Sequence, residues 1–279
     1  MGCSPFGHAY GSPDEAAAMK AVDAAFKSGV NFFDVAPFYA SGDAERLLGR
    51  AIKHLPRDQI IVATKLKHID LIQVHDIEFA EDMRQIVNET IPALQKLKEQ
   101  GLVRFIGITG YPLDIYTYVL DRVPAGAVDT ILSYCHNNLA DQTLLDLLPY
   151  LHEKGVGVIS ASFSSMGLLR KEGPPDWHPA PAAVKEAASK AAKHAQARGT
   201  DLAKLAITEF VRTPGISLNL MGMATPQEVE TDVQIVLEAL GIVPSKTAAL
   251  EAEVLPEVQK IMKPVMNTTW KTGLQDNRK

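Results

Sequence analysis

Short runs of apolar and β-branched residues alternate with helix-forming segments along almost the whole chain, and this rhythm most constrains the fold. The runs are apolar throughout rather than alternating with polar residues, which indicates strands buried on both faces. Such strands alternating with helices predict a parallel sheet covered by helices. Seven runs qualify, and they begin near residues 32, 60, 69, 104, 128, 156 and 216.

Capping residues and glycines set the expected helix boundaries. Ser12 is expected to cap a helix that has Pro13 at its first position and ends at Gly29. The stretch Phe163–Pro181 is too rich in proline for a helix or a strand. Further helices are expected near residues 43–53, 81–100, 112–122, 141–154 and 247–262, with two more between the last two strands.

Seven strands are one fewer than the eight that close a TIM barrel. The opening residues, "MGCSPFG", resemble the end of a first strand whose body is absent. An open doubly wound sheet is the alternative, but no G-x-G-x-x-G motif opens a helix in this chain. We therefore predict a TIM (β/α)8-type barrel, incomplete at strand 1. It is expected to form one domain over residues 1–279, with a C-terminal helix and tail over about 240–279.

The link between Lys65 and Ile69 is too short for this fold. Parallel neighbours need a crossover of about a dozen residues or more, usually a helix, and this link has three residues. We expect either a strained, incomplete barrel or an antiparallel turn at "LKH". Loss of the crossover helix would expose the apolar outer face of two strands, and loss of the first strand would leave an open edge beside residues 32–36.

Composition narrows the classes of partner. The formal charge of −5 and the pI near 5.9 disfavour nucleic acid. No apolar run approaches the roughly 20 residues of a membrane span. The two cysteines, Cys3 and Cys135, show no metal-binding spacing and are expected to be reduced thiols. We expect a cytoplasmic protein that binds small molecules and no metal.

Four residues at or near the ends of the first three expected strands can together carry proton chemistry. They are Asp34, Tyr39, Lys65 and His75. In a barrel the active site lies at the C-terminal ends of the strands. A tyrosine, with a reference pKa near 10, is a poor base at neutral pH, but an adjacent ammonium favours its phenolate and a carboxylate holds that ammonium. The histidine can orient the same reacting oxygen.

These residues make the chain resemble the aldo-keto reductases, whose Asp, Tyr, Lys and His lie on a TIM barrel. Asp34 and Tyr39 lie in "FDVAPFY", Lys65 closes "VATK" and His75 closes "DLIQVH". The resemblance implies that Tyr39 accepts the substrate proton with help from Lys65 and Asp34. Compared with the family, the chain lacks the N-terminal hairpin with strand 1 and the helix between Lys65 and Ile69.

Longer segments, including "QIVNETIPALQKLKEQG" and "GPPDWHPA", are similar to plant members of this family. That likeness implies NAD-dependent oxidation of L-galactose at C1 to L-galactono-1,4-lactone, on the plant route to ascorbate, by a monomer. An enzyme acting on another aldose or an aldehyde, and an inactive truncated protein that binds cofactor, remain as alternatives.

The resemblance also implies a set of cofactor contacts at the later strand ends. Thr109 and Gly110 would meet the carboxamide, Ser133 and Tyr134 the nicotinamide ring. The remaining residues are expected along the pyrophosphate and the adenosine half: Ser162, Met166, Gly167, Leu168, Gly222, Met223, Ala224, Thr225, Glu228 and Asp232.

Glu228 bears on the choice of cofactor. NADPH-using relatives place an arginine there against the 2′-phosphate, whereas a carboxylate would repel that phosphate and accept bonds from a free ribose hydroxyl. This favours NAD, although an acid in a first helical turn is also explained by the helix dipole. His136, Asn137 and Trp177 are weaker candidates for contact with the sugar.

Overall fold

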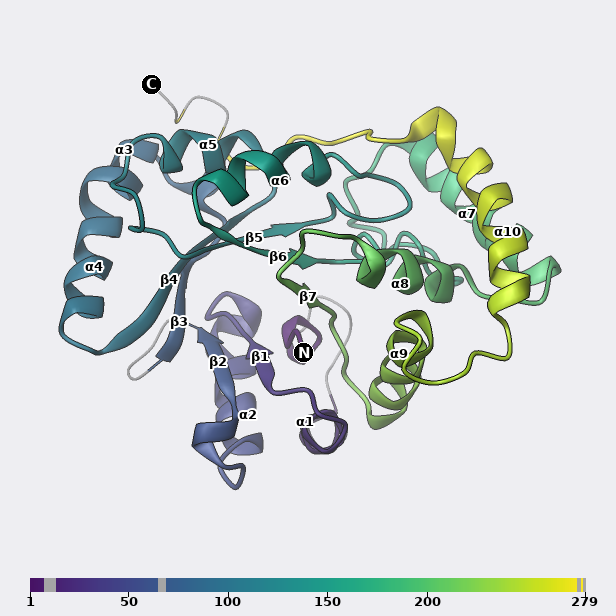
Figure 1. Ribbon diagram of the computed structural model, residues 1–279, viewed down its shortest axis with the longest axis horizontal. Helices are drawn as coiled ribbons and strands as arrows, with labels where there is room; N and C mark the ends of the chain where they lie inside the picture. The colour runs from purple at the N-terminus through teal and green to yellow at the C-terminus, as the bar shows by residue number, and fades with distance from the viewer. Residues whose placement is uncertain (8–13, 65–68, 275–276, 278–279) are drawn as a thin grey trace.

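The computed structural model describes residues 1–7, 14–64, 69–274 and 277, and at its centre seven parallel strands form one sheet. The strands follow chain order across the sheet (Figure 1). Their bounds are β1 Phe32–Asp34, β2 Ile61–Thr64, β3 Ile69–Val74, β4 Val103–Gly110, β5 Thr130–Tyr134, β6 Gly157–Ala161 and β7 Leu218–Leu220. The prediction of seven parallel strands is confirmed.

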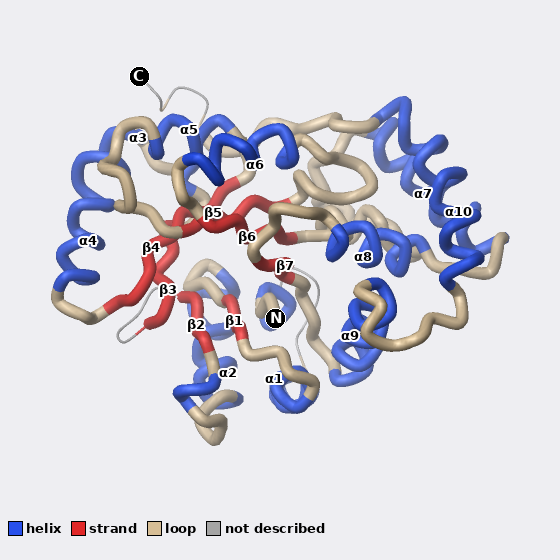
Figure 2. The backbone as a smooth tube through the Cα atoms, in the orientation of Figure 1, coloured by secondary structure: helices blue, strands red, loops and turns tan. Residues whose placement is uncertain are grey.

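Helices cover the outside of the curled sheet (Figure 2). They are α1 Glu15–Lys27, α2 Asp43–Ala51, α3 Met83–Gln85, α4 Ile91–Glu99, α5 Asp114–Leu120, α6 Leu144–Glu153, α7 Ala182–Ala197, α8 Leu202–Arg212, α9 Pro226–Ala239 and α10 Ala248–Met262. The helix expected near 81–100 is interrupted by a π-helical turn, Ile86–Thr90, just before Pro92, which has no N–H to donate. As expected, residues 163–181 form neither helix nor strand.

The first helix begins later than the sequence suggested. Its N-cap is Asp14, whose Oδ1 accepts a hydrogen bond from the N–H of Ala17 at 3.0 Å. The expected start at Pro13 is therefore wrong, because an aspartate directly before the helix supplies the acceptor that an N-cap needs. Ser12 and Pro13 themselves lie outside the described residues.

Two apolar layers meet at the sheet. The barrel interior is filled by small and branched side chains, among them Ala63, Leu71 and Leu132. The opposite face of the central strands packs against α4, α5 and α6, where Ile106 and Ile131 belong to a separate cluster. Burial on both faces explains why these strands are apolar throughout.

The chain's first residues occupy the edge that was expected to stay open. Gly2 forms parallel bridges with both Asp34 and Gly222, next to β1 and β7. Its N–H donates to the carbonyl of Met221 at 2.7 Å, and the N–H of Cys3 donates to the carbonyl of Asp34 at 2.8 Å. The barrel is thus incomplete at strand 1, but a short stump of that strand joins its two edges.

The strands on either side of the short link run in the same direction. β2 and β3 pair in parallel, with Ala63 opposite Leu71 and Thr64 opposite Ile72, so the alternative of an antiparallel turn is wrong. The linking residues 65–68 lie outside the described part. The expected exposure of the outer face is only partial: Val62, Ile72 and Val74 are half-buried against the helices beside them.

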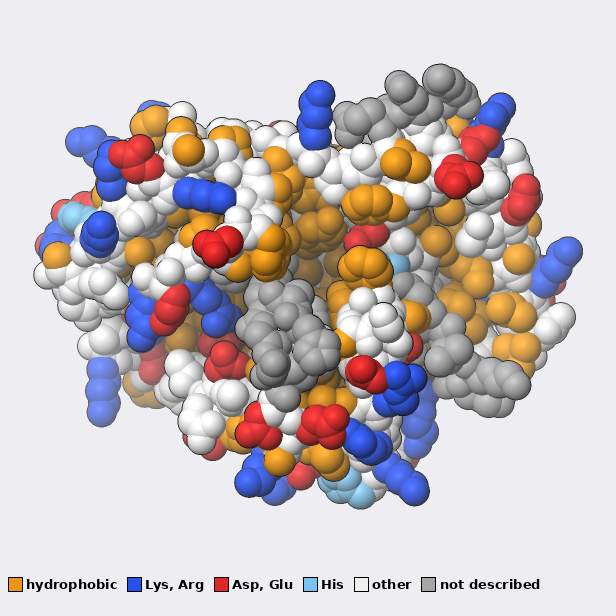
Figure 3. All heavy atoms as spheres, turned by 180° about the vertical axis from the view of Figure 1, so that it is seen from behind, with side chains coloured by type: hydrophobic (Ala, Val, Ile, Leu, Met, Phe, Trp, Pro, Cys, Tyr) orange, Lys and Arg blue, Asp and Glu red, His pale blue; other side chains and the backbone are white. Residues whose placement is uncertain are grey.

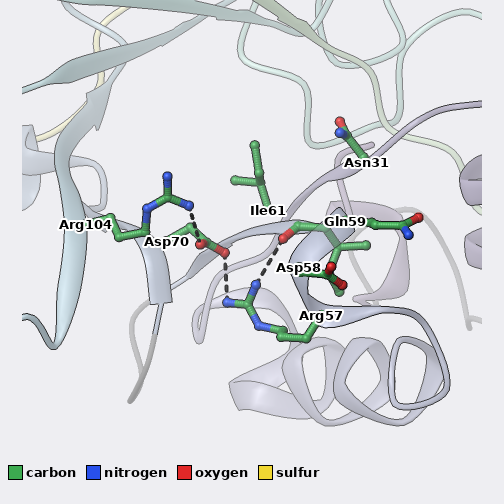
Figure 4. A pocket seen from close by; sticks show the side chains of 8 residues that line it. Asn31, Arg57, Asp58, Gln59, Ile61, Asp70 and Arg104 are labelled. Atoms are coloured by element: carbon green, nitrogen blue, oxygen red, sulfur yellow. Dashed lines mark hydrogen bonds and ion pairs between the residues drawn. The ribbon is translucent and has the colours of Figure 1, made fainter.

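A buried carboxylate supports β2 and β3 at their N-terminal ends, away from the expected site (Figure 4). Asp70 accepts hydrogen bonds from Arg57 at 2.8 Å, from Arg104 at 3.2 Å and from the backbone N–H of Val62 at 3.1 Å. Asp70, Arg57 and Arg104 border a cavity of about 580 Å³. The carboxylate therefore joins β2, β4 and the turn that precedes β2. The backbone ladder between β2 and β3 has two residue pairs.

Candidate active site

The predicted catalytic residues converge at the C-terminal ends of the strands. Asp34 ends β1 and is buried, and His75 directly follows β3. Tyr39 lies in a short turn of 3-10 helix, Tyr39–Gly42, after β1. Lys65 lies outside the described residues, so three of the four predicted residues are placed at this end of the barrel.

Asp34 has a partner that the sequence did not suggest. The side-chain amide of Gln73 donates from Nε2 to Asp34 Oδ2 at 2.7 Å. Gln73 lies on β3, and the pattern of this strand does not indicate that its side chain would reach a residue on β1.

An unusual turn places Tyr39. Ala40 and Ser41 have φ values of +50° and +51°, in the left-handed region that residues other than glycine rarely adopt, and Gly42 follows at +92°. Tyr39 contacts His75 edge-on, with ring centroids 5.8 Å apart and an interplanar angle of 84°. Two of the predicted catalytic side chains are therefore in contact.

His75 is linked to the next strand through Asp76. His75 Nδ1 lies 3.4 Å from Asp76 Oδ2, and the backbone N–H of Asp76 donates to Thr109 Oγ1 at 2.8 Å. The Thr109 hydroxyl also lies 3.3 Å from Asp76 Oδ1. Thr109, predicted to meet the nicotinamide carboxamide, is thus linked through Asp76 to the predicted catalytic residue His75.

The two β5 candidates lie on different faces of their strand. Tyr134 packs with the barrel interior, as Leu132 does, so Ser133 between them belongs to the other face. Burial, together with the charges of Asp76 and Glu78, raises the pKa of Tyr134 well above its usual value. The Tyr134 phenol is therefore neutral, and its ring offers an aromatic surface rather than an acid or a base.

The loop after β6 contains several left-handed residues among the predicted pyrophosphate contacts. Ser162, Met166 and Gly167 have φ values of +63°, +54° and +96°. Leu168, by contrast, is buried in the core formed by α7, α8 and α10. These φ values show that the loop winds tightly after β6.

Glu228 forms part of the N-terminal cap of α9. Its Oε2 accepts from the backbone N–H of Ala224 at 2.7 Å and of Thr225 at 3.2 Å, while Thr225 Oγ1 accepts from the N–H of Glu228. This is a capping box, which supports the helix explanation for an acid at this position. Its other oxygen lies 3.8 Å from Arg170 Nη1, a contact that sequence reasoning missed.

Asp232 lies one turn further along α9. Burial raises the pKa of Asp232 to about 6; Arg170 opposes this rise and Glu228 adds to it. Arg170, Glu228 and Asp232 all line a cavity of about 750 Å³ between α8, α9 and the loop after β6. Gly222 and Met223 lead into this region from β7.

His136 is held in one orientation beyond the end of β5. It is 3% exposed, and its Nδ1 lies 3.1 Å from Asp141 Oδ2 and 3.0 Å from Thr143 Oγ1. The Thr143 hydroxyl donates to Asp141, so both oxygens are acceptors for Nδ1–H. Burial raises the pKa of Asp141, but the hydrogen bonds and charge of His136, with the bonds from Thr143, bring it below its usual value.

The other two substrate candidates differ in setting. Asn137 is buried, and its amide bonds to Ser160 at 3.3 Å and to Thr213 at 3.1 Å, so its polar atoms already have partners within the protein. Trp177 is half exposed and stacks on His178.

The C-terminal tail crosses this end of the barrel. Trp270 stacks on Tyr111 with centroids 4.9 Å apart, and Tyr111 in turn contacts the His136 ring at 4.3 Å. Asn277 donates to the carbonyls of Glu78 and Ala80 after β3. From sequence the tail is expected only to follow the C-terminal helix, and nothing in its pattern indicates these contacts.

Side chains of both charges are interspersed over the rear face, with apolar side chains gathered towards its centre (Figure 3).

Within residues 1–7, 14–64, 69–274 and 277, no three His, Cys, Asp or Glu side chains are grouped so as to hold a metal ion. None of the described helices is long and apolar enough to span a membrane.

Comparison with known proteins gives consistent matches. A model of the aldo/keto reductase family matches residues 1–68 and 65–242. L-galactose dehydrogenase of Arabidopsis thaliana is 46% identical, over 99% of this chain and 94% of that protein. The alignment extends over 308 positions, 29 more than the 279 residues of the chain, so that relative contains segments absent here.

More distant proteins share the fold. D-arabinose 1-dehydrogenase of Saccharomyces cerevisiae is 29% identical over 90% of this chain and 85% of that protein. The structure of an aldo/keto reductase from Klebsiella pneumoniae in complex with NADP and acetate is 22% identical, with a TM-score of 0.67. The match covers 98% of this chain and 94% of the Klebsiella chain.

Proposed function

The chain belongs to the aldo/keto reductase family, and we propose that it oxidises an aldose at C1 with NAD. The observation that carries this proposal is the contact between Tyr39 and His75 at the strand ends where Asp34 also lies. Similarity to the Arabidopsis enzyme selects L-galactose as the substrate and the 1,4-lactone as the product. The compartment, the monomeric state and a place on the route to ascorbate rest on the same resemblance.

In the proposed reaction Tyr39 accepts the proton of the C1 hydroxyl. Lys65 favours the phenolate by its charge, and Asp34 holds that lysine. His75 orients the hydroxyl, and its position is in turn linked to Asp76 and Thr109. A bound nicotinamide dinucleotide would supply the hydride acceptor.

The polar groups of the residues expected to hold that dinucleotide suit NAD. Thr109, Gly110 and Tyr134, with the backbone of Ser133, would meet the nicotinamide half. Ser162 and the backbone of residues 166–168 would follow the pyrophosphate. At the adenosine end, residues 222–225 lead to Glu228 and Asp232, whose carboxylates suit a free ribose hydroxyl and oppose a phosphate. Glu228 can serve this role while it caps α9.

The substrate would be bound on the side of the tail. With Nδ1–H directed to Asp141, His136 Nε2 is the ring atom left to bond a sugar hydroxyl. Asn137 and Trp177 are proposed only as neighbours of the sugar. Tyr111 contacts the His136 ring and Trp270 of the tail stacks on Tyr111, so the tail lies next to this proposed contact.

The test is an NADH absorbance assay on the purified chain with L-galactose and NAD. We expect turnover, and we expect Tyr39→Phe to lower kcat by about 10² or more because the proton acceptor is lost. Tyr118→Phe, on the outer helix α5, is the matched control and should retain activity.

Other outcomes separate the alternatives. A preference for NADP would contradict the NAD assignment, and faster turnover of another aldose or an aldehyde would change the substrate. Binding of NAD without turnover of any sugar would favour the inactive, cofactor-binding protein.

A further inference from the structure

Gln73 is a polar side chain inside an apolar barrel. It is 4% exposed and lies on the same face of β3 as Leu71, which belongs to the interior cluster. Its Nε2 donates to Asp34 Oδ2 at 2.7 Å. The two residues lie on β1 and β3, so the hydrogen bond passes across β2.

Small residues make room for this contact. Ala63 lies on β2 between the two partners, paired with Asp34 on one side and with Leu71 on the other. Gly107 flanks Gln73 on β4, and a Cβ at Gly107 would come within 3.3 Å of Gln73 Cγ and 2.6 Å of Thr130 Oγ1. The interior is shaped to hold the glutamine against the carboxylate.

The amide can face Asp34 in one way. A carboxylate only accepts, so the Gln73 NH2 group must point towards it. Gln73 Oε1 is then buried, with no hydrogen-bond partner among the described residues. An apolar side chain of the same length would avoid that unpaired acceptor, so the bond to Asp34 is what the glutamine contributes here.

We propose that Gln73 is a positioning residue that orients Asp34 and keeps it ionised. The inference rests on the proposed function, since Asp34 serves the proton transfer of Tyr39 through Lys65. Other titratable groups face Asp34 from the stump of strand 1. They are the Met1 amino group and the Cys3 thiol, whose pKa burial raises to about 12.

The first test is Gln73→Met, which keeps the length of the side chain and removes the donor. We expect kcat to fall about tenfold with little change in KM, because a bond to a charged group is lost without loss of substrate contacts. Asn219→Leu, which removes an amide from β7, is the control and should leave kcat unchanged. A wild-type kcat in Gln73→Met would overturn the proposal.

Gln73→Glu supplies a readout that packing alone would not move. A protonated glutamic acid can donate to Asp34, whereas two carboxylates repel each other. Its kcat should approach the wild-type value near pH 5 and fall with rising pH relative to that of Gln73→Met. Parallel pH profiles of the two variants would contradict the inference.

A third measurement does not depend on activity. The pKa of Asp34, followed by carboxyl NMR in the whole protein, should rise in Gln73→Met and stay unchanged in Asn219→Leu. If the wild-type chain turns over no sugar but this rise is observed, the proposed function fails and the role of Gln73 stands. If the pKa does not rise, the role of Gln73 fails whether or not the chain is active.

Discussion

Three charged side chains, those of Glu228, Asp232 and Arg170, lie close together at the start of α9. Glu228 is bonded to the backbone N–H groups of Ala224 and Thr225, and Arg170 approaches it from the loop after β6. Asp232 has no such set of donors within the described part of the chain, and burial is the largest cause of the rise in its pKa. At the start of this helix one acid is thus well bonded and the other is poorly solvated.

We expect Asp232→Asn to stabilise the protein at neutral pH. The pKa of Asp232 is raised to about 6, so the folded state binds its proton more tightly than the unfolded state does. That acid favours folding at low pH and costs stability as pH rises through 4 to 6. Urea denaturation at pH 8 should show a gain of about 1–2 kcal/mol, the shift being discounted for partial exposure.

The gain should vanish below about pH 4, where both states are protonated. Glu230→Gln, an exposed acid on the same helix, is the control and should change little. A gain that is equal at pH 4 and pH 8 would contradict the assigned cause.

Single residues at strand ends were predictable, and their partners were not. Asp34 and His75 could be placed because the C-terminal ends of parallel strands meet at one end of a barrel. Gln73 and Arg170 could not, because each acts through a contact between segments far apart in sequence. Pattern alone also left the role of Glu228 open between capping and cofactor binding.

At the scale of elements, β2 and β3 depend on a side-chain brace. Asp70 is 8% exposed at its side chain and receives donors from three neighbouring segments. The direct ladder between the strands contains two residue pairs. Removing the carboxylate therefore weakens the pairing and leaves the N–H of Val62 without this acceptor.

We expect Asp70→Asn to lower the free energy of unfolding at pH 7 by about 1–2 kcal/mol. Burial raises the pKa of Asp70, but the bonds from Val62, Arg57 and Arg104 bring it below the usual value. The stabilisation is therefore full above about pH 4 and is lost as pH falls through the folded-state pKa. Denaturation curves at several pH values measure both effects.

Asp58→Asn removes another carboxylate that lines the same cavity and is the matched control. It should leave stability unchanged. Equal losses in the two variants would show that the charge of the cavity matters rather than the bonds of Asp70.

The sequence was sufficient for the type and order of the elements, but not for the pairing at the short link. Periodicity identified the strands because burial on both faces makes them apolar throughout. The rule that parallel neighbours need a long crossover made an antiparallel turn plausible, yet β2 and β3 are parallel. In that parallel register Ala63 and Leu71 lie side by side in the interior cluster, a long-range arrangement that strand periodicity alone does not predict.

For the whole molecule, we expect the absence of the crossover helix to lower the free energy of unfolding without preventing the barrel from folding. Inserting an amphipathic helix between Thr64 and Ile69 should raise the free energy of unfolding. Val62, Ile72 and Val74 are half-buried, and covering each completely is worth about 1 kcal/mol. Thermal and urea denaturation of the two proteins measure the gain.

A flexible Gly/Ser insertion of equal length is the control, because it lengthens the link without covering the strands. If it stabilises the protein as much as the helix does, relief of strain in the link would be the cause instead. If neither insertion changes the free energy of unfolding, covering the half-buried face of Val62, Ile72 and Val74 further does not stabilise the protein.

The bridges of Gly2 have a consequence for the order of folding. They join residues 2 and 222, whereas neighbouring strands elsewhere in the ring follow one another along the chain. Contacts between residues so far apart carry a large loop-closure cost and form late. During synthesis the first residues must wait until nearly the whole barrel wall has been made before they can take their place in it.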